Sequence, residues 1–327
     1  MKHYVYLRAI FFFALVVALV NFDIAFSQDD YPNRTIKIVV PVAPGAATDK
    51  LARIISEQLR IKANQPVIVE NKAGGASGNV GAEFVMRAPP DGYTLLFSAA
   101  GPIALNQLVF TKMPFNSADF VPVSLTASIP NVLLVRNDST LKSVNDIIIT
   151  SKINPGKLNY GSGGAGTTVH ITTELFKAIN GIDVVHIPYK ATAASITALL
   201  QGQIDFMFAE LSSTYPLIKS GNLRALAVGS EMRAPLLPEI PTMAEIIPRF
   251  VSTVWYGFVA PPKTPQVVVA RLSGWISDIV KHPEIMTQFQ SINVLGIGST
   301  PQEMTDFIKV EINRWGAVAR ASKISVD

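Results

Sequence analysis

After residue 35, short apolar runs alternate with longer segments whose apolar residues recur at helical spacing. The first run, Ile36–Val40 (IKIVV), is rich in β-branched residues and stops at Pro41, so it predicts a buried strand. A helix is predicted next, from Thr48 or Asp49, because apolar residues then recur every three or four positions. Further strands are predicted at 67–69, 94–98, 158–160, 184–187, 204–208, 224–228 and 254–259. Further helices are predicted at 79–86, from 167, from about 193 and 214, at 265–280 and after 301.

Strands that alternate with helices indicate an α/β fold, with parallel sheets covered by helices on both faces. Residues 120–135 are mostly extended and apolar, broken by Pro130, and we expect them to cross into a second domain. The strand at 224–228 is the expected return. We therefore predict two doubly wound α/β domains joined by crossover strands around a central cleft, with 28–128 and 227–327 in the first domain and 129–226 in the second.

The N-terminus has the pattern of an export signal. Lys2 and Arg8 precede an apolar run at 9–20, and Ala25 and Ser27 supply the small residues that a signal peptidase reads. A run of this length is shorter than the roughly 20 apolar residues of a spanning helix, although a retained anchor is the alternative. We expect residues 1–27 to be a signal peptide cleaved near Ser27, which predicts a periplasmic protein.

Composition excludes several classes of function. The chain has no cysteine, so it has no disulfide, no thiol nucleophile and no cysteine-bound metal. Its formal charge is +4, without a basic run, which does not favour nucleic-acid binding. We expect no cofactor and a monomer.

The glycine-rich loop at 161–166 (GSGGAG) is the centre of the predicted site, because a strand precedes it and a helix follows. Glycines let backbone N–H groups point at one spot, and the first amides of a helix have no partner within the helix. This geometry favours an anion. The spacing also matches a dinucleotide fingerprint, but the acidic residue expected about 20 positions later is missing, since Asp183 begins the next strand instead of ending it. A tight structural turn is the third possibility.

Three similar loops follow other predicted strands: PVAPGAATD from Pro41, NKAGGASGN from Asn71, in which Asn79 is a candidate helix cap, and Ala99-Ala100-Gly101. In parallel sheets, ligands bind beyond the carboxyl ends of the strands. The loops therefore predict a cleft that holds a small carboxylate by backbone amides.

Enzyme signatures are absent from the sequence. Neither Ser77 nor Ser162 lies in Gly-x-Ser-x-Gly, and no glycine loop ends in Gly-Lys-Ser/Thr. His170, His186 and His282 lack the spacing of metal ligands. We therefore predict a binding protein without catalysis or metal.

Several polar residues near the loops have two interpretations. His170 lies in a first helical turn, off the apolar face, and would either donate to the carboxylate or be solvated. Thr167 and Thr168 would cap their helix or reach ligand, and Asp49 would complement a helix dipole or orient ligand or loop. Asp205, within the apolar run IDFMF, would be satisfied by backbone donors or would meet a ligand amine or hydroxyl.

Taken together, APGAATD, NKAGGASGNVGAE, DGYTLLFS, NYGSGGAGTTVHITTELF, HIPYK, LLQGQIDFMF and IPTMAEI resemble the substrate-binding proteins of tripartite tricarboxylate transporters, the Bug family. The resemblance covers nearly the whole chain after the signal. It implies a type II-like periplasmic binding protein that captures a small organic acid and hands it to a membrane permease. A periplasmic ligand-sensing subunit is the alternative, and a dinucleotide-dependent enzyme is a weaker one.

By position, the resemblance implies a set of ligand-binding residues in the glycine-rich and alanine-rich loops and at one acidic strand position. These are Ala46, Ala47, Thr48, Asp49, Gly75, Ser77, Gly78, Ala99, Ala100, Gly163, Gly164, Ala165, Gly166, Thr167, Thr168, His170 and Asp205. The first loop departs from the family pattern at Ala46, which replaces a glycine, and the segment after HIPYK has Ala191-Thr192-Ala193 in place of a glycine-rich step. These departures leave the class intact and leave the ligand's identity open.

Overall fold

The predicted strands and helices form an α/β fold in a computed structural model that describes residues 31–74 and 76–321. From Arg34 onward the described residues form one compact unit. Its first part contains β1 (Ile36–Val40), α2 (Ala47–Ala63), β2 (Val67–Asn71), α3 (Asn79–Met86) and β3 (Thr94–Ala99), with short helical turns η2 (Ala76–Gly78), η3 (Gly101–Leu105), η4 (Asn106–Leu108) and η5 (Ser117–Asp119). The middle contains β4 (Val121–Arg136), α4 (Val144–Ile153), β5 (Asn159–Ser162), α5 (Thr168–Asn180), β6 (Val185–Pro188), α6 (Thr192–Leu200), β7 (Phe206–Glu210), α7 (Leu211–Lys219) and β8 (Leu223–Val228). The last part contains α8 (Met243–Ile246), β9 (Thr253–Ala260), α9 (Gln266–Val280), α10 (Pro283–Ser291), β10 (Leu295–Gly296) and α11 (Pro301–Ala321).

The strands of the described residues form one ten-stranded mixed sheet in the order β2-β1-β3-β9-β4-β7-β5-β6, with β8 and β10 also paired to β4. β1, β2 and β3 pair in parallel, as do β5, β6 and β7. The predicted parallel pairing is found within β1–β3 and within β5–β7, but β4 and β9 run antiparallel to their neighbours, so the sheet as a whole is mixed. Sequence periodicity identifies a buried strand but carries no signal for the direction of its partner.

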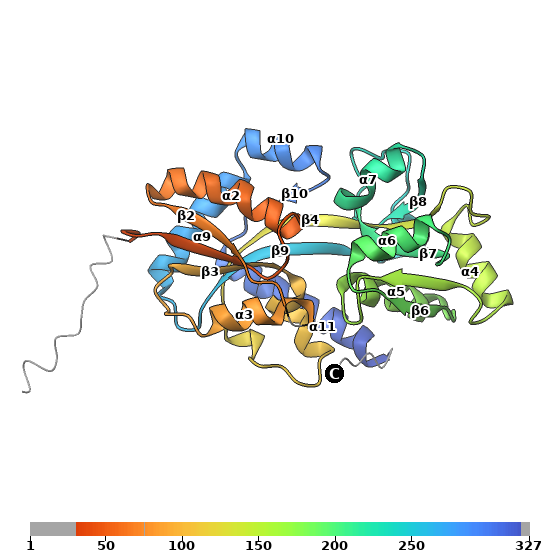
Figure 1. Cartoon of the computed structure of the whole chain (residues 1–327), viewed down its shortest axis with the longest axis horizontal. Helices are drawn as coiled ribbons and strands as arrows, with labels where there is room; N and C mark the ends of the chain where they lie inside the picture. The colour runs from red at the N-terminus through yellow and green to blue at the C-terminus, as the bar shows by residue number, and fades with distance from the viewer. Residues whose placement is uncertain (1–30, 75, 322–327) are drawn as a thin grey trace, which may run out of the picture. The chain divides into compact units, whose positions relative to one another are not determined.

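β4 is the longest strand described, and it changes partners along its length. Its first part, up to Pro130, pairs with β9, and its second part, from Asn131, pairs with β7 and β8. Pro130 does not break the strand, contrary to the sequence expectation; it lies opposite Thr253 at the end of the β9 ladder, where a missing N–H is tolerated. Figure 1 shows β4 and β9 running between a group that contains α2, α3 and α9 and another that contains α4 to α7.

A hydrogen-bonded junction lies where β4 changes partners. Asn131 accepts from the Gly229 amide through its backbone carbonyl, at 2.6 Å, and its side chain donates to the Ser252 hydroxyl at 2.7 Å. The Ser252 amide in turn donates to the Gly229 carbonyl at 2.7 Å. Three segments that are distant in sequence are therefore joined at one place.

The apolar core divides around this junction. One buried cluster joins β3, η3 and α11 through residues such as Leu96, Ile103 and Trp315. Another joins Phe176 and Phe208 with Phe250, which follows α8. The segment just before β9 therefore packs with β7 and α5 and not with β1–β3.

The predicted signal sequence and its cleavage point near Ser27 lie outside the described residues. Within residues 31–74 and 76–321, no helix has the length and apolarity that a membrane crossing requires.

Candidate functional site

The predicted loops leave the carboxyl ends of neighbouring parallel strands. Residues 41–46 follow β1, residues 72–74 and 76–78 follow β2, and Ala100 follows β3, so the parallel pairing brings these segments to one edge of the sheet. Gly78, at φ 86°, lies so close to Pro41 that a Cβ atom would stand 3.0 Å from the Pro41 carbonyl oxygen. Glycine is required here both for the left-handed backbone and for the contact between the first two loops.

Tyr256 of β9 brings together residues from the ends of two strands and from the first turn of a helix. It pairs with Ala99 in the sheet, and its hydroxyl donates to Glu210 Oε2 at 2.9 Å. The Thr48 side chain is close enough to interact with the same hydroxyl and to oppose the rise of its pKa. The first turn of α2, the end of β3 and the end of β7 are therefore gathered around one buried ring.

Glu210 is a candidate site residue that the sequence prediction misses. Burial raises the pKa of its carboxyl, and the hydrogen bond from Tyr256 lowers it by less. Because β5 and β7 are parallel with Tyr160 opposite Phe206, Glu210 lies at the level of the central glycine loop. The sequence expectation ended this strand at residue 208, whereas β7 continues to Glu210, so the acidic residue at its carboxyl end was not recognised.

The central loop is held from within the protein by two histidines. The Ser162 hydroxyl donates to the Gly164 carbonyl at 3.0 Å, accepts from the Gly164 amide at 3.1 Å and lies 2.7 Å from His186 Nε2. The Gly166 amide, at φ 77°, donates to His170 Nδ1 at 3.0 Å. These bonds occupy two of the amides that the sequence assigned to the anion.

The two imidazoles stack with ring centroids 4.0 Å apart, and His186 stacks on Tyr160. Since His170 Nδ1 accepts from the Gly166 amide, the proton of the neutral ring lies on Nε2. The donor in the bond between Ser162 and His186 Nε2 depends on the tautomer of His186. Burial lowers the pKa of His170, and burial together with the neighbouring His170 lowers the pKa of His186 to about 4. The expectation that His170 lies off the core side is wrong, because it is only 7% exposed.

The helices that follow the carboxyl ends of β1–β3 and of β5–β7 lack side-chain caps. No side chain caps α2, α3, α5, α6 or α7, and α9 and α10 are also without one, whereas α4 and α8 carry complete capping boxes at Ser143 and Thr242. Thr167, a candidate cap, instead donates its hydroxyl to the Gly164 carbonyl at 2.8 Å. Among the described residues, no protein hydrogen bond engages the amides of Ala47, Thr48, Asp49, Ala165, Thr168 and Val169. These amides provide the positive helix ends that an anion requires.

Asp49 orients a loop. Its carboxylate accepts from the Gly45 amide at 2.9 Å and from the Asn71 side chain at 2.9 Å, and it pairs with Arg53 at 3.0 Å. Burial acts to raise its pKa, but these hydrogen bonds and the Arg53 charge outweigh burial and lower it. Asp49 therefore fastens the loop after β1 to the end of β2.

The second loop differs in detail from its prediction. Gly75 lies outside the described residues. Ser77 adopts a left-handed backbone, with φ 53°, and Gly78 occupies the cap position of α3. Asn79 is not the cap, because it lies inside the helix and accepts from the Asn106 side chain at 2.6 Å.

Asp205 lies at the opposite end of the strands from the loops. It precedes β7 and accepts from the Asn159 amide, at the start of β5, at 2.7 Å. The structure thus favours the first of its two interpretations, a carboxylate satisfied by the backbone. Within residues 31–74 and 76–321, no three His, Asp or Glu side chains cluster in a way that would hold a metal ion.

This mixed α/β fold, with helix N-termini gathered at strand ends, is the fold of periplasmic solute-binding proteins. An R. palustris protein solved with adipate, Rpa4515, is 34% identical, with a TM-score of 0.83 over 90% of this chain and 99% of that one. MatC from Rhodopseudomonas palustris, solved with bound malate, is 28% identical, with a TM-score of 0.78 over 88% of this chain and 99% of that one.

The sequence model described as the tripartite tricarboxylate transporter family receptor matches residues 51–324, so the chain belongs to that family. The protein BugT of Bordetella pertussis is 34% identical over 90% of this chain and 91% of its own length. The family consists of periplasmic solute receptors and not of enzymes. The resemblance inferred from the sequence motifs is confirmed.

Proposed function

We propose that this protein captures a small organic acid by means of backbone amides and delivers it to the membrane permease of a tripartite tricarboxylate-type transporter. The observation that carries the proposal is the set of uncapped N-termini at α2 and α5, which leaves the amides of their first turns without protein partners. Helix N-termini favour carboxylates through these amides and the helix dipole. The adipate and malate seen with two relatives support the ligand class.

The partly satisfied central loop restricts where the carboxylate would bind. Because His170 and Ser162 engage the amides of Gly166 and Gly164, we assign the anion to Ala165 and to the first turn of α5. His170 is then a positioning residue that holds the loop in shape. The first turn of α2, from Ala47 to Asp49, would hold a second polar group of the ligand.

We also propose closure between two lobes, as the sequence analysis expects for 28–128 with 227–327 and for 129–226. One adjustment follows from packing: Phe250 contacts Phe176 and Phe208, so we place the return to the first lobe at the start of β9 and not at 227. The junction of Asn131, Gly229 and Ser252 is then the hinge. We further propose cleavage of the signal near Ser27 and a monomeric mature chain.

The amide mechanism is tested by deleting single N–H groups with proline at the first position of a helix, where proline is well tolerated. Thr168 and Ala47 occupy this position in α5 and α2, and both are preceded by residues with extended ψ values, 156° and 162°, that suit a following proline. Adipate, malate and further organic acids are first screened by thermal shift. We expect Thr168→Pro and Ala47→Pro each to weaken binding of the best acid roughly 10- to 150-fold, the worth of a hydrogen bond to a charged group.

Two controls isolate the amide. Thr168→Ala removes the hydroxyl and keeps the N–H, and Gln266→Pro makes the same backbone change at the first position of α9, whose N-cap is Pro265. Both controls should bind as the native chain does in isothermal titration calorimetry. If Thr168→Pro and Ala47→Pro fold and bind with native affinity, the carboxylate is not held by these amides.

A further inference from the structure

The buried carboxylates in the described part of the chain are each paired with a cation. Asp49, Glu174 and Glu311 are the acidic residues concerned. Their partners are Arg53 at 3.0 Å, Lys177 at 2.8 Å and Arg314 at 3.4 Å, in that order. Each pair offsets the cost of taking a carboxylate out of water.

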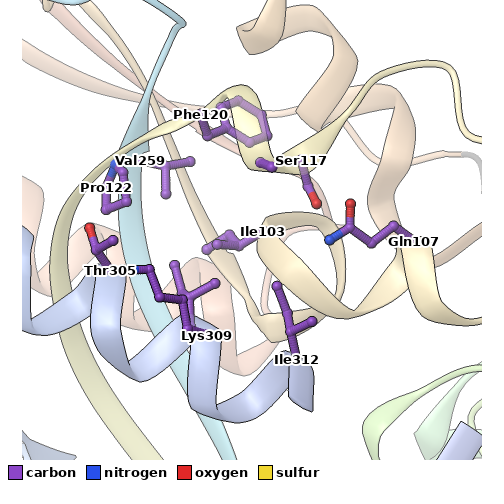
Figure 2. Close-up of a pocket in the computed structure, with 11 residues that line it drawn as sticks. Ile103, Gln107, Ser117, Phe120, Pro122, Val259, Thr305, Lys309 and Ile312 are labelled. Carbon is purple, nitrogen blue, oxygen red and sulfur yellow. The ribbon is translucent and has the colours of Figure 1, made fainter. Parts of the chain in front are cut away.

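The apolar hollow beside α11 also offers a ligand no unpaired charge. Figure 2 shows Lys309 rising from α11 next to Thr305 and Ile312, and Lys309 is the charged residue in the lining of this hollow. Its Nζ atom lies 3.1 Å from Asp306 Oδ1, so its charge is compensated within the helix.

Glu210, at the end of β7, differs from these acids. It is half-buried, and among residues 31–74 and 76–321 no lysine, arginine or histidine acts on it, so burial raises the pKa of its carboxyl. It is the N-cap residue of α7, but its side chain does not cap that helix. The carboxyl is therefore neither half of an ion pair nor a helix cap.

One oxygen of this carboxyl is engaged and the other is open. Oε2 accepts from the Tyr256 hydroxyl at 2.9 Å. Oε1 has no hydrogen-bond partner among the described residues, and it does not belong to the unpartnered polar atoms that are closed off from solvent. A ligand can therefore reach Oε1.

This open oxygen lies near the loop and the helix turn to which we assign the organic acid. The parallel pairing of β5 with β7 puts Glu210 at the level of the central glycine loop. The side chain of Thr48, in the first turn of α2, approaches the same Tyr256 hydroxyl that binds Glu210. The ligand and Glu210 are therefore expected to meet.

A carboxylate without a cation is a poor neighbour for a second carboxylate, because like charges in a partly desolvated site repel each other. A hydrogen-bond donor on the ligand removes this conflict. An ammonium or hydroxyl group would bond to Oε1, and hydrogen bonds to an ionised acceptor are the stronger ones.

We propose that Glu210 is a specificity-determining residue, whose Oε1 accepts a hydrogen bond from an ammonium or hydroxyl group of the ligand. The preferred ligand is then an amino acid or a hydroxy acid and not a plain dicarboxylate. This inference rests on the proposed capture of an organic acid and names the class of acid.

Matched acids of equal chain length test the proposal. Succinate is compared with malate and aspartate, and glutarate and adipate are each compared with their hydroxy and amino derivatives. Isothermal titration calorimetry on the purified native chain gives each dissociation constant. In the series that binds most tightly, we expect the hydroxy or amino acid to bind at least about tenfold more tightly than the plain acid. The two derivatives show whether the donor is a hydroxyl or an ammonium group.

Glu210→Gln is the deciding variant. Glutamine has the same shape, and its carbonyl oxygen still accepts from Tyr256, so its amide NH₂, a donor, takes the place of Oε1. The preference for the donor-bearing acid should disappear or reverse in this variant. Glu239→Gln is the matched control: Glu239 is exposed, so this variant should keep the native preference.

The outcomes separate this inference from the proposed function. If the plain dicarboxylate binds the native chain as tightly as its derivatives, or if Glu210→Gln keeps the preference, Glu210 does not select the ligand. The first of these results is the one expected of a protonated Glu210 that donates to a carboxylate. If none of the acids binds the native chain, the proposed function fails and this inference fails with it.

Discussion

At the scale of single residues, this site depends on side chains that hold the loops more than on side chains that face a ligand. Asp49 fastens the first loop, and Ser162, His170 and His186 fasten the central one. The two histidines are neutral because burial in the stack with Tyr160 disfavours their charged form. The loop geometry is therefore linked to pH.

Stability should fall as these histidines are forced to take up protons. The pKa of His186 is about 4 in the folded chain against 6.5 without burial, so the unfolded chain binds the proton first. The stabilisation is fully present above pH 6.5 and is lost as the pH falls from 6.5 toward 4. We expect the melting temperature to drop across this window, and to drop less in His186→Gln, whose amide offers Ser162 both a donor and an acceptor but does not titrate.

His282→Gln is the matched control, since His282 is exposed at the start of α10. It should follow the native pH profile in differential scanning calorimetry. A His186→Gln profile that runs parallel to the native one would show that this histidine does not set the acid sensitivity.

At the scale of elements, the central loop is shaped by its contact with the start of α6. Gly163 has ordinary backbone angles, but a Cβ atom there would lie 2.6 Å from Thr192 Oγ1 and 2.9 Å from the Thr192 amide nitrogen. The need for glycine at this position is therefore a matter of space and not of conformation. A single methyl group should push β5 and α6 apart.

We expect Gly163→Ala to destabilise the protein by about 1–3 kcal/mol, the usual cost of overpacking, and to weaken binding of the organic acid. Gly274→Ala is its control: this glycine lies within α9 and has nothing within 4 Å of its Cβ position, so alanine should be neutral or stabilise by roughly 0.5–1 kcal/mol. Urea unfolding measures both values. Equal stability of the two variants would mean that the loop can move away from Thr192 without cost.

At the scale of the whole molecule, one strand connects both groups of helices. β4 pairs with β9 up to Pro130 and with β7 and β8 from Asn131. A bend of this strand near residue 131 would therefore move the N-terminus of α5 relative to the N-terminus of α2. A ligand held by both termini would favour the closed arrangement.

Small-angle X-ray scattering tests this closure. Saturation with the organic acid that binds most tightly should reduce the radius of gyration, because both proposed lobes contact the same ligand. Thr168→Pro, at the same acid concentration, should show a smaller reduction, because less of the variant is bound. Saturation confirmed by calorimetry, without any change in the radius of gyration, would contradict hinge closure.

The sequence by itself determined the fold class, the family and the loops, because β-branched runs, helical periodicity and glycine clusters are local signals. It also located the carboxyl ends of the strands to within two residues, although it stopped β2, β5 and β7 two residues early and so missed Glu210. These features depend on neighbours within a few positions along the chain.

Only the tertiary structure decided which polar groups meet. The bond between Tyr256 and Glu210 joins residues 46 positions apart, and the stack of His170 on His186 depends on the pairing of β5 with β6. The same holds for Asp205, whose partner Asn159 is supplied by another strand, and for the antiparallel direction of β4 and β9. Partners of this kind are set by sheet order and register, and the local spacing of residues carries no record of either.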